Sequence, residues 1–262
     1  MIKALLFDFG DTLVFFDKWD YNKCLSKMLE SLKQNSVVIP VSYQEFKRVY
    51  FEVRRHMYKE VEDSYGEIDF RVRLVKTLKR FDLNFSHEDP IITRAADAFF
   101  EGWDEDMRID NYVLPVLERL KKDYKLGIIS NFPYRKALLA TLERFGLSHF
   151  FEAIVISAEL EVRKPSPKIF EEALTILDVK ASDTVFVGDT LKTDIFGAQN
   201  VGMKTILVKN PELKTNRYAV PSDLRYVHVK PDYTIADLKE LRAALLVLSS
   251  VCMKSNSERT LR

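Results

Sequence analysis

The spacing of apolar and polar positions changes at about residue 111, after which two patterns alternate. Short runs rich in Val and Ile predict buried strands at residues 125–129, 153–156, 184–187 and 204–208. Apolar side chains at helical spacing predict helices at residues 113–122, 134–145, 167–177 and 191–200. Strands that alternate with helices are typical of a parallel sheet covered on both faces. Residues 2–7 predict one more strand of this kind.

The segment between that first strand and residue 111 predicts helices almost throughout. Apolar stripes at helical spacing are Leu25, Met28, Leu29 and Leu32, then Phe46, Val49, Tyr50 and Val53, then Ile68, Val72, Val75 and Leu78, with a fourth helix over 91–100. We therefore predict an α/β fold with a Rossmann-like parallel sheet core, made of residues 1–15 and 109–250. An inserted all-α domain occupies residues 16–108. A closing helix over 237–248 precedes a polar tail at 251–262.

Composition and charge exclude several classes of protein. The 262 residues are 47% apolar, so a full hydrophobic core is possible. Forty basic and 39 acidic residues leave a net charge of +1, which gives no electrostatic reason to expect nucleic acid or an anionic membrane. Cys24 and Cys252 lie far apart, and no apolar run approaches the ~20 residues of a membrane span. We expect a cytoplasmic monomer or homodimer.

Polar side chains follow four of the predicted strands. Asp8 follows residues 2–7, Ser130-Asn131 follows 125–129, Lys164 lies downstream of 153–156, and Gly188-Asp189 follows 184–187. In an open parallel sheet, ligands bind in the crevice beyond the carboxyl ends of the strands. A carboxylate, a hydroxyl and amide, an ammonium group and further carboxylates therefore converge on one place. That set suits a phosphate and a magnesium ion.

Asp8 is the most informative of these residues, because an unpaired carboxylate at the mouth of a buried strand is costly to desolvate. One interpretation is a turn or helix-cap residue. The other is a nucleophile that accepts a phosphoryl group and needs a metal beside it to neutralise charge and align the phosphate. Thr12 would hydrogen-bond and orient this loop, or cap it.

The other three loops each allow a structural and a chemical interpretation. Ser130 and Asn131 precede a helix, where they serve either as ordinary caps or as an anion site at the positive end of the helix dipole. Lys164 lies between prolines; a lone Lys is usually solvated, but this one would stabilise Asp8 and a transferring phosphoryl group. Asp189 follows a glycine that permits close approach and suits magnesium, and Asp194 complements the helix dipole.

Taken in order, these loops resemble the four motifs of the haloacid dehalogenase (HAD) superfamily of phosphohydrolases. Asp8 to Thr12 looks like the first motif, Ser130 the second, Lys164 the third, and Gly188-Asp189 with Asp194 the fourth. The helical insert resembles the C1 cap of that family, which closes over the substrate. The resemblance implies that Asp8 is the nucleophile of a phosphatase and that a small phosphorylated metabolite is the substrate. It also implies Mg²⁺ on Asp8, the Gly10 carbonyl and Asp189, with Asp194 in support, and phosphate on Ser130, Asn131 and Lys164.

One position departs from the family pattern. Phosphatases of this family generally carry a second Asp two residues after the nucleophile, where it acts as general acid and base. Here that position is Gly10, and Asp11 follows it. Glycine makes the loop flexible, so Asp11 is a candidate for the missing role. Without any such group, turnover would be slower, because acid–base catalysis typically contributes ~10²–10⁴-fold.

Three other functions stay open at this point. Phosphonate-cleaving members of the family lack the second Asp but use a cap lysine as a Schiff base, and the candidates here are Lys18, Lys23, Lys27 and Lys59. Dehalogenases also lack it, but they do not need the metal that the two later aspartates suggest. A regulatory protein with a weakened HAD core would bind Mg²⁺ or phosphate without turnover. Candidates for substrate contact in the cap are Phe15, Phe16, Trp19, Tyr21, Arg54, Arg55 and His56.

Overall fold

The computed structural model describes the chain except for residues 17–19, 210–223 and 260–262, and Lys18 and Trp19 therefore lie outside the described residues. Its centre is a six-stranded sheet in the order β5-β4-β1-β6-β7-β8, in which every neighbouring pair is parallel. The strands are β1 (Ala4–Phe7), β4 (Lys125–Ser130), β5 (Ala153–Ile156), β6 (Thr184–Gly188), β7 (Lys204–Val208) and β8 (Tyr233–Ile235). The predicted α/β fold with a parallel, Rossmann-like core is confirmed.

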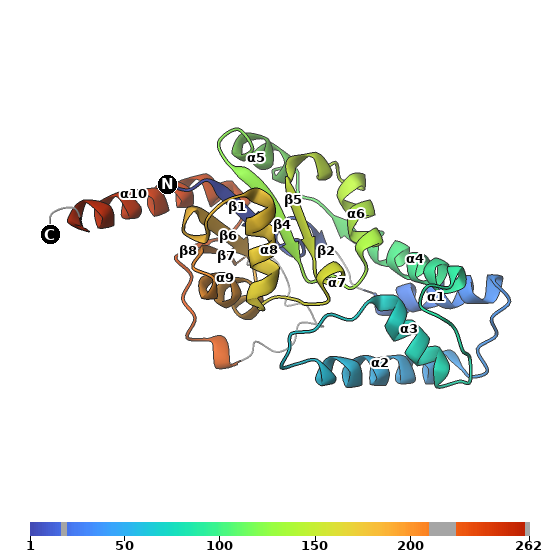
Figure 1. Ribbon diagram of the computed structural model, residues 1–262. Coiled ribbons are helices and arrows are strands. Elements are labelled where there is room, and N and C mark those ends of the chain that lie inside the picture. Colours follow the sequence, from blue (N-terminus) through green and yellow to red (C-terminus); the bar gives the residue numbers. More distant parts are fainter. Residues whose placement is uncertain (17–19, 210–223, 260–262) are drawn as a thin grey trace.

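Helices cover both faces of this sheet (Figure 1). They are α5 (Val113–Leu120), α6 (Arg135–Arg144), α7 (Ser157–Leu160), α8 (Pro167–Leu177), α9 (Gly197–Asn200) and α10 (Leu241–Arg259). One apolar cluster lies on the side of Leu5, Phe7 and Val185, and a second lies on the side of Leu6 and Phe186. Side chains from both faces of β1 are therefore fully enclosed, as in a doubly covered parallel sheet.

Four helices form a separate lobe beside the sheet (Figure 1). They are α1 (Tyr21–Gln34), α2 (Tyr43–Glu60), α3 (Phe70–Lys79) and α4 (Pro90–Asp104), with α1 packed on α4 and α2 on α3. Each begins at a residue whose side chain accepts a hydrogen bond from the first turn: Asp20, Ser42, Asp69 and Asp89. The chain enters and leaves the lobe through a short antiparallel pair, β2 (Phe15–Phe16) with β3 (Met107–Arg108). We call residues 20–106 the helical insert.

The structure differs from the sequence-based expectations in two predicted helices and in several short elements, which include β2, β3, β8 and α7. β8 was not predicted, because three residues are too few to show an alternating pattern. The helix expected over 191–200 is a π-helical turn, Leu191–Phe196, followed by α9. The closing helix runs to Arg259 and so includes most of the predicted tail. No helix in the described part of the chain combines the length and the apolar character needed to cross a membrane.

Candidate active site

Asp8 lies at the middle of the carboxyl edge of the sheet. β1 is flanked by β4 and β6, and all four of its residues are buried. The backbone N–H of Asp8 donates to the carbonyl of Val187 at 2.9 Å, so the residue after the strand is still fixed to β6. The most central strand therefore presents its carboxylate at the crevice where parallel sheets bind ligands.

Lys164 joins two of the predicted carboxylates. Its Nζ lies 2.5 Å from Asp8 Oδ1 and 2.7 Å from Asp194 Oδ1, and its side chain is only 2% exposed. Burial acts to lower the pKa of Lys164, but the two carboxylates outweigh that effect and raise the pKa above its ordinary value. The ammonium group therefore stays charged, and the solvated-lysine interpretation does not apply here.

Asp194 is held inside the site by the turn that follows β6. Its side chain is 1% exposed, and its second oxygen accepts a hydrogen bond from the N–H of Thr190 at 2.9 Å. Thr190 accepts backbone bonds from both Asp194 and Ile195, which produces the π-helical turn. A Cβ at Gly188 would lie 2.6 Å from the Asp194 carboxylate. The glycine is therefore needed for the approach of Asp194.

The carboxylates of Asp8, Asp189 and Asp194 fit a divalent cation. One oxygen from each lies within 4.8 Å of the others. Burial raises the pKa of Asp189 well above its usual range, and the charges of Asp194 and Asp8 raise it further. Burial likewise raises the pKa of Asp8, although Lys164 opposes the change. Three carboxylates face a single ammonium group, so this cluster lacks a positive charge that a hard, oxygen-binding cation would supply.

Ser130 and Asn131 differ in what their side chains do. The amide of Asn131 accepts from the backbone N–H of Lys164 at 2.7 Å and donates to its carbonyl at 3.1 Å. Asn131 therefore fixes the Lys164 loop to the end of β4. Among the described residues, neither the Ser130 hydroxyl nor the backbone N–H of Asn131 has a hydrogen-bond partner. These two groups are thus the ones available to an anion.

Comparison with known proteins agrees with this geometry. Residues 2–202 match the haloacid dehalogenase-like hydrolases. The chain belongs to this family. It is 32% identical over 245 residues to the glyceraldehyde 3-phosphate phosphatase of Pyrococcus furiosus, covering 93% of each chain. The 2-haloacid dehalogenase of Pseudomonas syringae superposes with a TM-score of 0.72 at 27% identity, over 95% of this chain and 100% of that one. The HAD phosphatase of Thermococcus onnurineus superposes with a TM-score of 0.60 at 25% identity, over 93% of this chain and 98% of that one.

In this haloacid dehalogenase-like hydrolase, the position of the missing second Asp is spacious. A Cβ at Gly10 would meet no atom within 4 Å, and no N–H or O–H of the described residues donates to the Gly10 carbonyl. Asp11 has a left-handed backbone, with φ of 56°, and its charge adds to the rise in the Asp189 pKa. Burial raises the pKa of Asp11 itself. Thr12 was expected to orient the loop by a hydrogen bond or to cap it, but its buried hydroxyl has no partner in the part of the chain that the structure describes.

A buried link between the insert and the core was not predicted from the sequence. Glu67 accepts from the hydroxyls of Ser157, at 2.7 Å, and Tyr58, at 2.8 Å. The Ser157 oxygen also accepts from the N–H of Phe132 at 2.8 Å. Beside this link, Gly66 pairs with Val162 as a β-bridge. Glu67 and Ser157 are 90 positions apart, and no spacing rule connects them.

The cap candidates fall into separate groups. Phe15 and Tyr21 belong to the hydrophobic core, and Phe16 packs against it. Arg55 and His56 are exposed, whereas Arg54 is half-buried. Lys23 and Lys27 form ion pairs with Asp106 and Glu105, at 2.7 and 2.5 Å, and these hydrogen bonds raise both lysine pKa values. A Schiff-base lysine needs a lowered pKa, so neither suits phosphonate cleavage.

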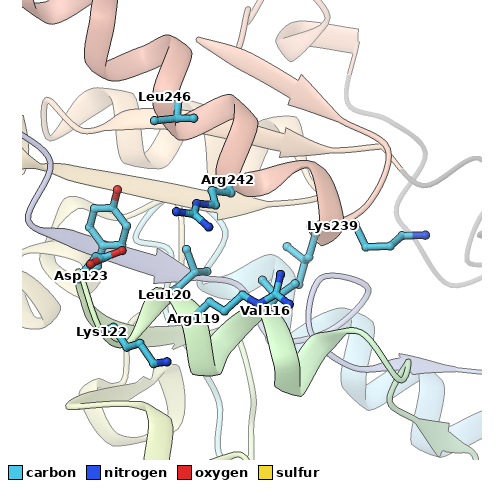
Figure 2. Close-up of a pocket in the computed structure, with 10 residues that line it drawn as sticks. Val116, Arg119, Leu120, Lys122, Asp123, Lys239, Arg242 and Leu246 are labelled. Atoms are coloured by element: carbon cyan, nitrogen blue, oxygen red, sulfur yellow. The ribbon is translucent and has the colours of Figure 1, made fainter.

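A cavity of about 410 Å³ lies between α5 and α10, and none of the motif residues lines it. Figure 2 shows its basic lining, which includes Arg119, Lys122, Lys239 and Arg242. Tyr124, at the amino end of β4, also lines it. Since Asp8 and the other motif residues lie at the carboxyl ends of the strands, this cavity is not part of the candidate active site.

Proposed function

We propose that this hydrolase is a Mg²⁺-dependent phosphatase that cleaves a small phosphomonoester through an aspartyl-phosphate on Asp8. The contact that carries the proposal is the ion pair of Asp8 with Lys164, which in turn binds Asp194. It places a nucleophile beside a permanent positive charge and a cluster of hard oxygen ligands. The phosphatase named among the relatives supports the same chemistry.

The residues of the site divide the chemistry among them. A carboxylate oxygen of Asp8 attacks phosphorus, and the bond from phosphorus to the leaving alkoxide breaks. Lys164, the Ser130 hydroxyl and the N–H of Asn131 bind the phosphoryl oxygens. Bound Mg²⁺, held by Asp8, Asp189 and the Gly10 carbonyl with Asp194 in support, would neutralise charge on the phosphate.

Two proton transfers complete the reaction. The leaving alkoxide takes a proton, for which the candidate on this chain is Asp11. Water then attacks the phosphorus of the aspartyl-phosphate, loses a proton, and releases inorganic phosphate with the Asp8 carboxylate restored. The helical insert acts as the cap in this proposal: it excludes water and contacts the leaving group. The bridge of Gly66 with Val162 supports that role, because it joins the insert to the loop that carries Lys164.

The test is phosphate release from p-nitrophenyl phosphate and a panel of phosphorylated metabolites. Asp8→Asn should abolish release, because an amide cannot attack phosphorus, and EDTA should stop the wild-type enzyme. Residual activity of Asp8→Asn within tenfold of wild type would contradict the nucleophile assignment. Chloride release from 2-chloropropionate in EDTA would instead favour a dehalogenase, and Mg²⁺ binding without any turnover would favour a regulatory protein.

A further inference from the structure

The helical insert contains a group of buried polar atoms that have no hydrogen-bond partner among the described residues. They are Tyr50 Oη and Arg54 Nε on α2, one turn apart, and Arg73 Nε on α3. Each buried group left unsatisfied costs about 1–3 kcal/mol. A fold that encloses three such atoms between two helices has a structural cost there that packing alone does not explain.

Arg73 is the most costly of the three. Its side chain is 4% exposed, and no carboxylate in the described part of the chain forms an ion pair with it. Its guanidinium lies over the rings of Phe70, at 4.8 Å, and Tyr50, at 5.3 Å. These contacts are weaker than pairing with an anion, and arginine cannot lose its charge as a lysine can.

Two further arginines surround the neighbouring tyrosine. The ring of Tyr58 has Arg54 at 5.6 Å and Arg163 at 4.7 Å. Among the described residues, Glu67 is the carboxylate whose charge acts on both Tyr58 and Arg73. Its oxygens already accept hydrogen bonds from Tyr58, Ser157 and the N–H of Ile68. Arg73 therefore has near it only a carboxylate that is already engaged, and neither Arg54 nor Arg163 forms an ion pair with a described carboxylate.

This group of arginines extends from the insert to the candidate active site. Arg163 directly precedes Lys164, and its N–H donates to the carbonyl of Tyr65, in the loop between α2 and α3. The N–H of Phe70, at the start of α3, donates to the carbonyl of Pro133, close to Ser130 and Asn131. The arginines thus belong to segments of the insert and core that contact each other beside the loops carrying Ser130, Asn131 and Lys164.

We propose that Arg73, together with Arg54 and Arg163, binds a second anionic group on the part of the substrate that is not transferred. The ligand is a phosphomonoester that also carries a carboxylate or a second phosphate. Planar guanidinium groups recognise both anions through paired N–H donors. The inference rests on the proposed phosphatase function and narrows its substrate class.

The experiment compares related substrates with and without a second anionic group. Three matched pairs are glyceraldehyde 3-phosphate with 3-phosphoglycerate, glucose 6-phosphate with 6-phosphogluconate, and fructose 6-phosphate with fructose 1,6-bisphosphate. In at least one pair, the member with the second anionic group should have a kcat/KM about 10- to 100-fold higher, the scale of charge-assisted hydrogen bonds. The first two pairs test a carboxylate, and the third tests a phosphate.

Variants then locate the recognition. Arg73→Gln should remove the preference for the substrate with the second anionic group. The kcat/KM for the other substrate of the pair should stay within about threefold of wild type. Arg54→Gln, at a half-buried position, should reduce the preference too, and it keeps the test valid if Arg73→Gln does not fold. The matched control is Arg71→Gln, because Arg71 lies on the same helix but is already paired with Asp69 at 2.9 Å. It should leave the preference unchanged.

The outcomes separate the two proposals. If no phosphomonoester, including p-nitrophenyl phosphate, is hydrolysed, the proposed function has failed. If p-nitrophenyl phosphate is hydrolysed but the enzyme prefers the substrate with the second anionic group in none of the pairs, the proposal of a second-anion site is wrong. It is also wrong if Arg73→Gln and Arg54→Gln fold, shown by thermal unfolding, and keep the wild-type preference.

Discussion

Two buried cations, Lys164 in the core and Arg73 in the helical insert, have opposite surroundings. Lys164 forms ion pairs with Asp8 and Asp194, and further carboxylates lie beside it. Arg73 has aromatic rings around it and no ion pair in the described part of the chain. Among the buried groups, carboxylates therefore outnumber cations around Lys164, whereas the guanidinium group of Arg73 has no ion-pair partner in the described part of the chain.

This difference indicates what each region must bind. Excess carboxylates are typical of a metal site, where the cation completes the charge balance. An excess of guanidinium groups is typical of an anion site. A magnesium ion would therefore complete the core, and an anionic group of the substrate would complete the insert. Replacing Lys164 should therefore lower the free energy of unfolding, whereas replacing Arg73 should raise it.

Lys164→Met should have the largest effect, because it leaves two buried carboxylates without their partner. We expect kcat to fall by at least ~10³-fold and the free energy of unfolding to fall by about 3–5 kcal/mol in metal-free buffer. Phosphate release and urea unfolding are the measurements. Lys168→Met, at an exposed lysine four residues later, is the control and should change neither. Stability within 1 kcal/mol of wild type would mean that the ion pairs of Lys164 contribute little.

Gly10→Asp should have the next largest effect, on the leaving group. The space around a Cβ at Gly10 can accept the side chain, and the added carboxyl would protonate alkoxides. We expect hydrolysis of alkyl phosphates to rise up to ~10²-fold relative to p-nitrophenyl phosphate, whose phenolate leaves without a proton. Asp11→Asn is the companion variant. If Asp11 is the general acid of the wild type, this variant should lose its activity on alkyl phosphates and keep its activity on p-nitrophenyl phosphate. If the ratio of alkyl phosphate to p-nitrophenyl phosphate hydrolysis is unchanged in both variants, the proton comes from water and not from Asp11.

The sequence predicts the four helices of the insert as well as most strands of the core, but it identifies the buried polar groups of the core far better than those of the insert. Short apolar runs mark β1, β4, β5, β6 and β7, and the loops after them bring polar residues from the strand ends to one edge. Local patterns therefore place Asp8, Lys164, Asp189 and Asp194 together. Arg73 was not singled out, although an arginine beside the apolar positions Phe70 and Leu74 was a usable signal. The link of Glu67 to Ser157 could not be predicted, because it depends on how the insert docks.

Magnesium should stabilise the protein more at high pH than at low pH. In the metal-free protein, burial raises the pKa of Asp8 to about 7, from 3.8 in an unfolded chain, and raises that of Asp189 too. The folded state then binds more protons than the unfolded state, so its stability falls as pH rises from about 4 to 7. The raised pKa of Lys164 has no effect below pH 9, because both states are protonated there.

Saturating Mg²⁺ should remove that loss, because it binds the ionised carboxylates. At 100 times its Kd it adds ~2.7 kcal/mol, so the Tm increase with 10 mM MgCl₂ should be several degrees at pH 8 and clearly smaller at pH 5.5. Differential scanning calorimetry measures both. Asp189→Asn should reduce the increase at either pH. Equal increases at pH 5.5 and 8 in the wild type would contradict the metal assignment to these carboxylates.

Arg73→Met should have the smallest effect, and its sign distinguishes the two regions. Methionine keeps the apolar contacts with Phe70 and Tyr50 but removes a buried charge that forms no ion pair with any described residue. Replacing such a charge with an apolar group of similar size is often neutral or stabilising. In the absence of substrate, we expect the free energy of unfolding to rise by about 1–2 kcal/mol. This net value already includes the loss of the cation–π contacts. Arg71→Met removes a paired guanidinium from the same helix and should lower stability slightly or leave it unchanged. Urea unfolding of both variants decides the matter: a clear loss of stability in Arg73→Met would mean that the aromatic rings already satisfy this cation, and that the insert has no need of an anionic ligand.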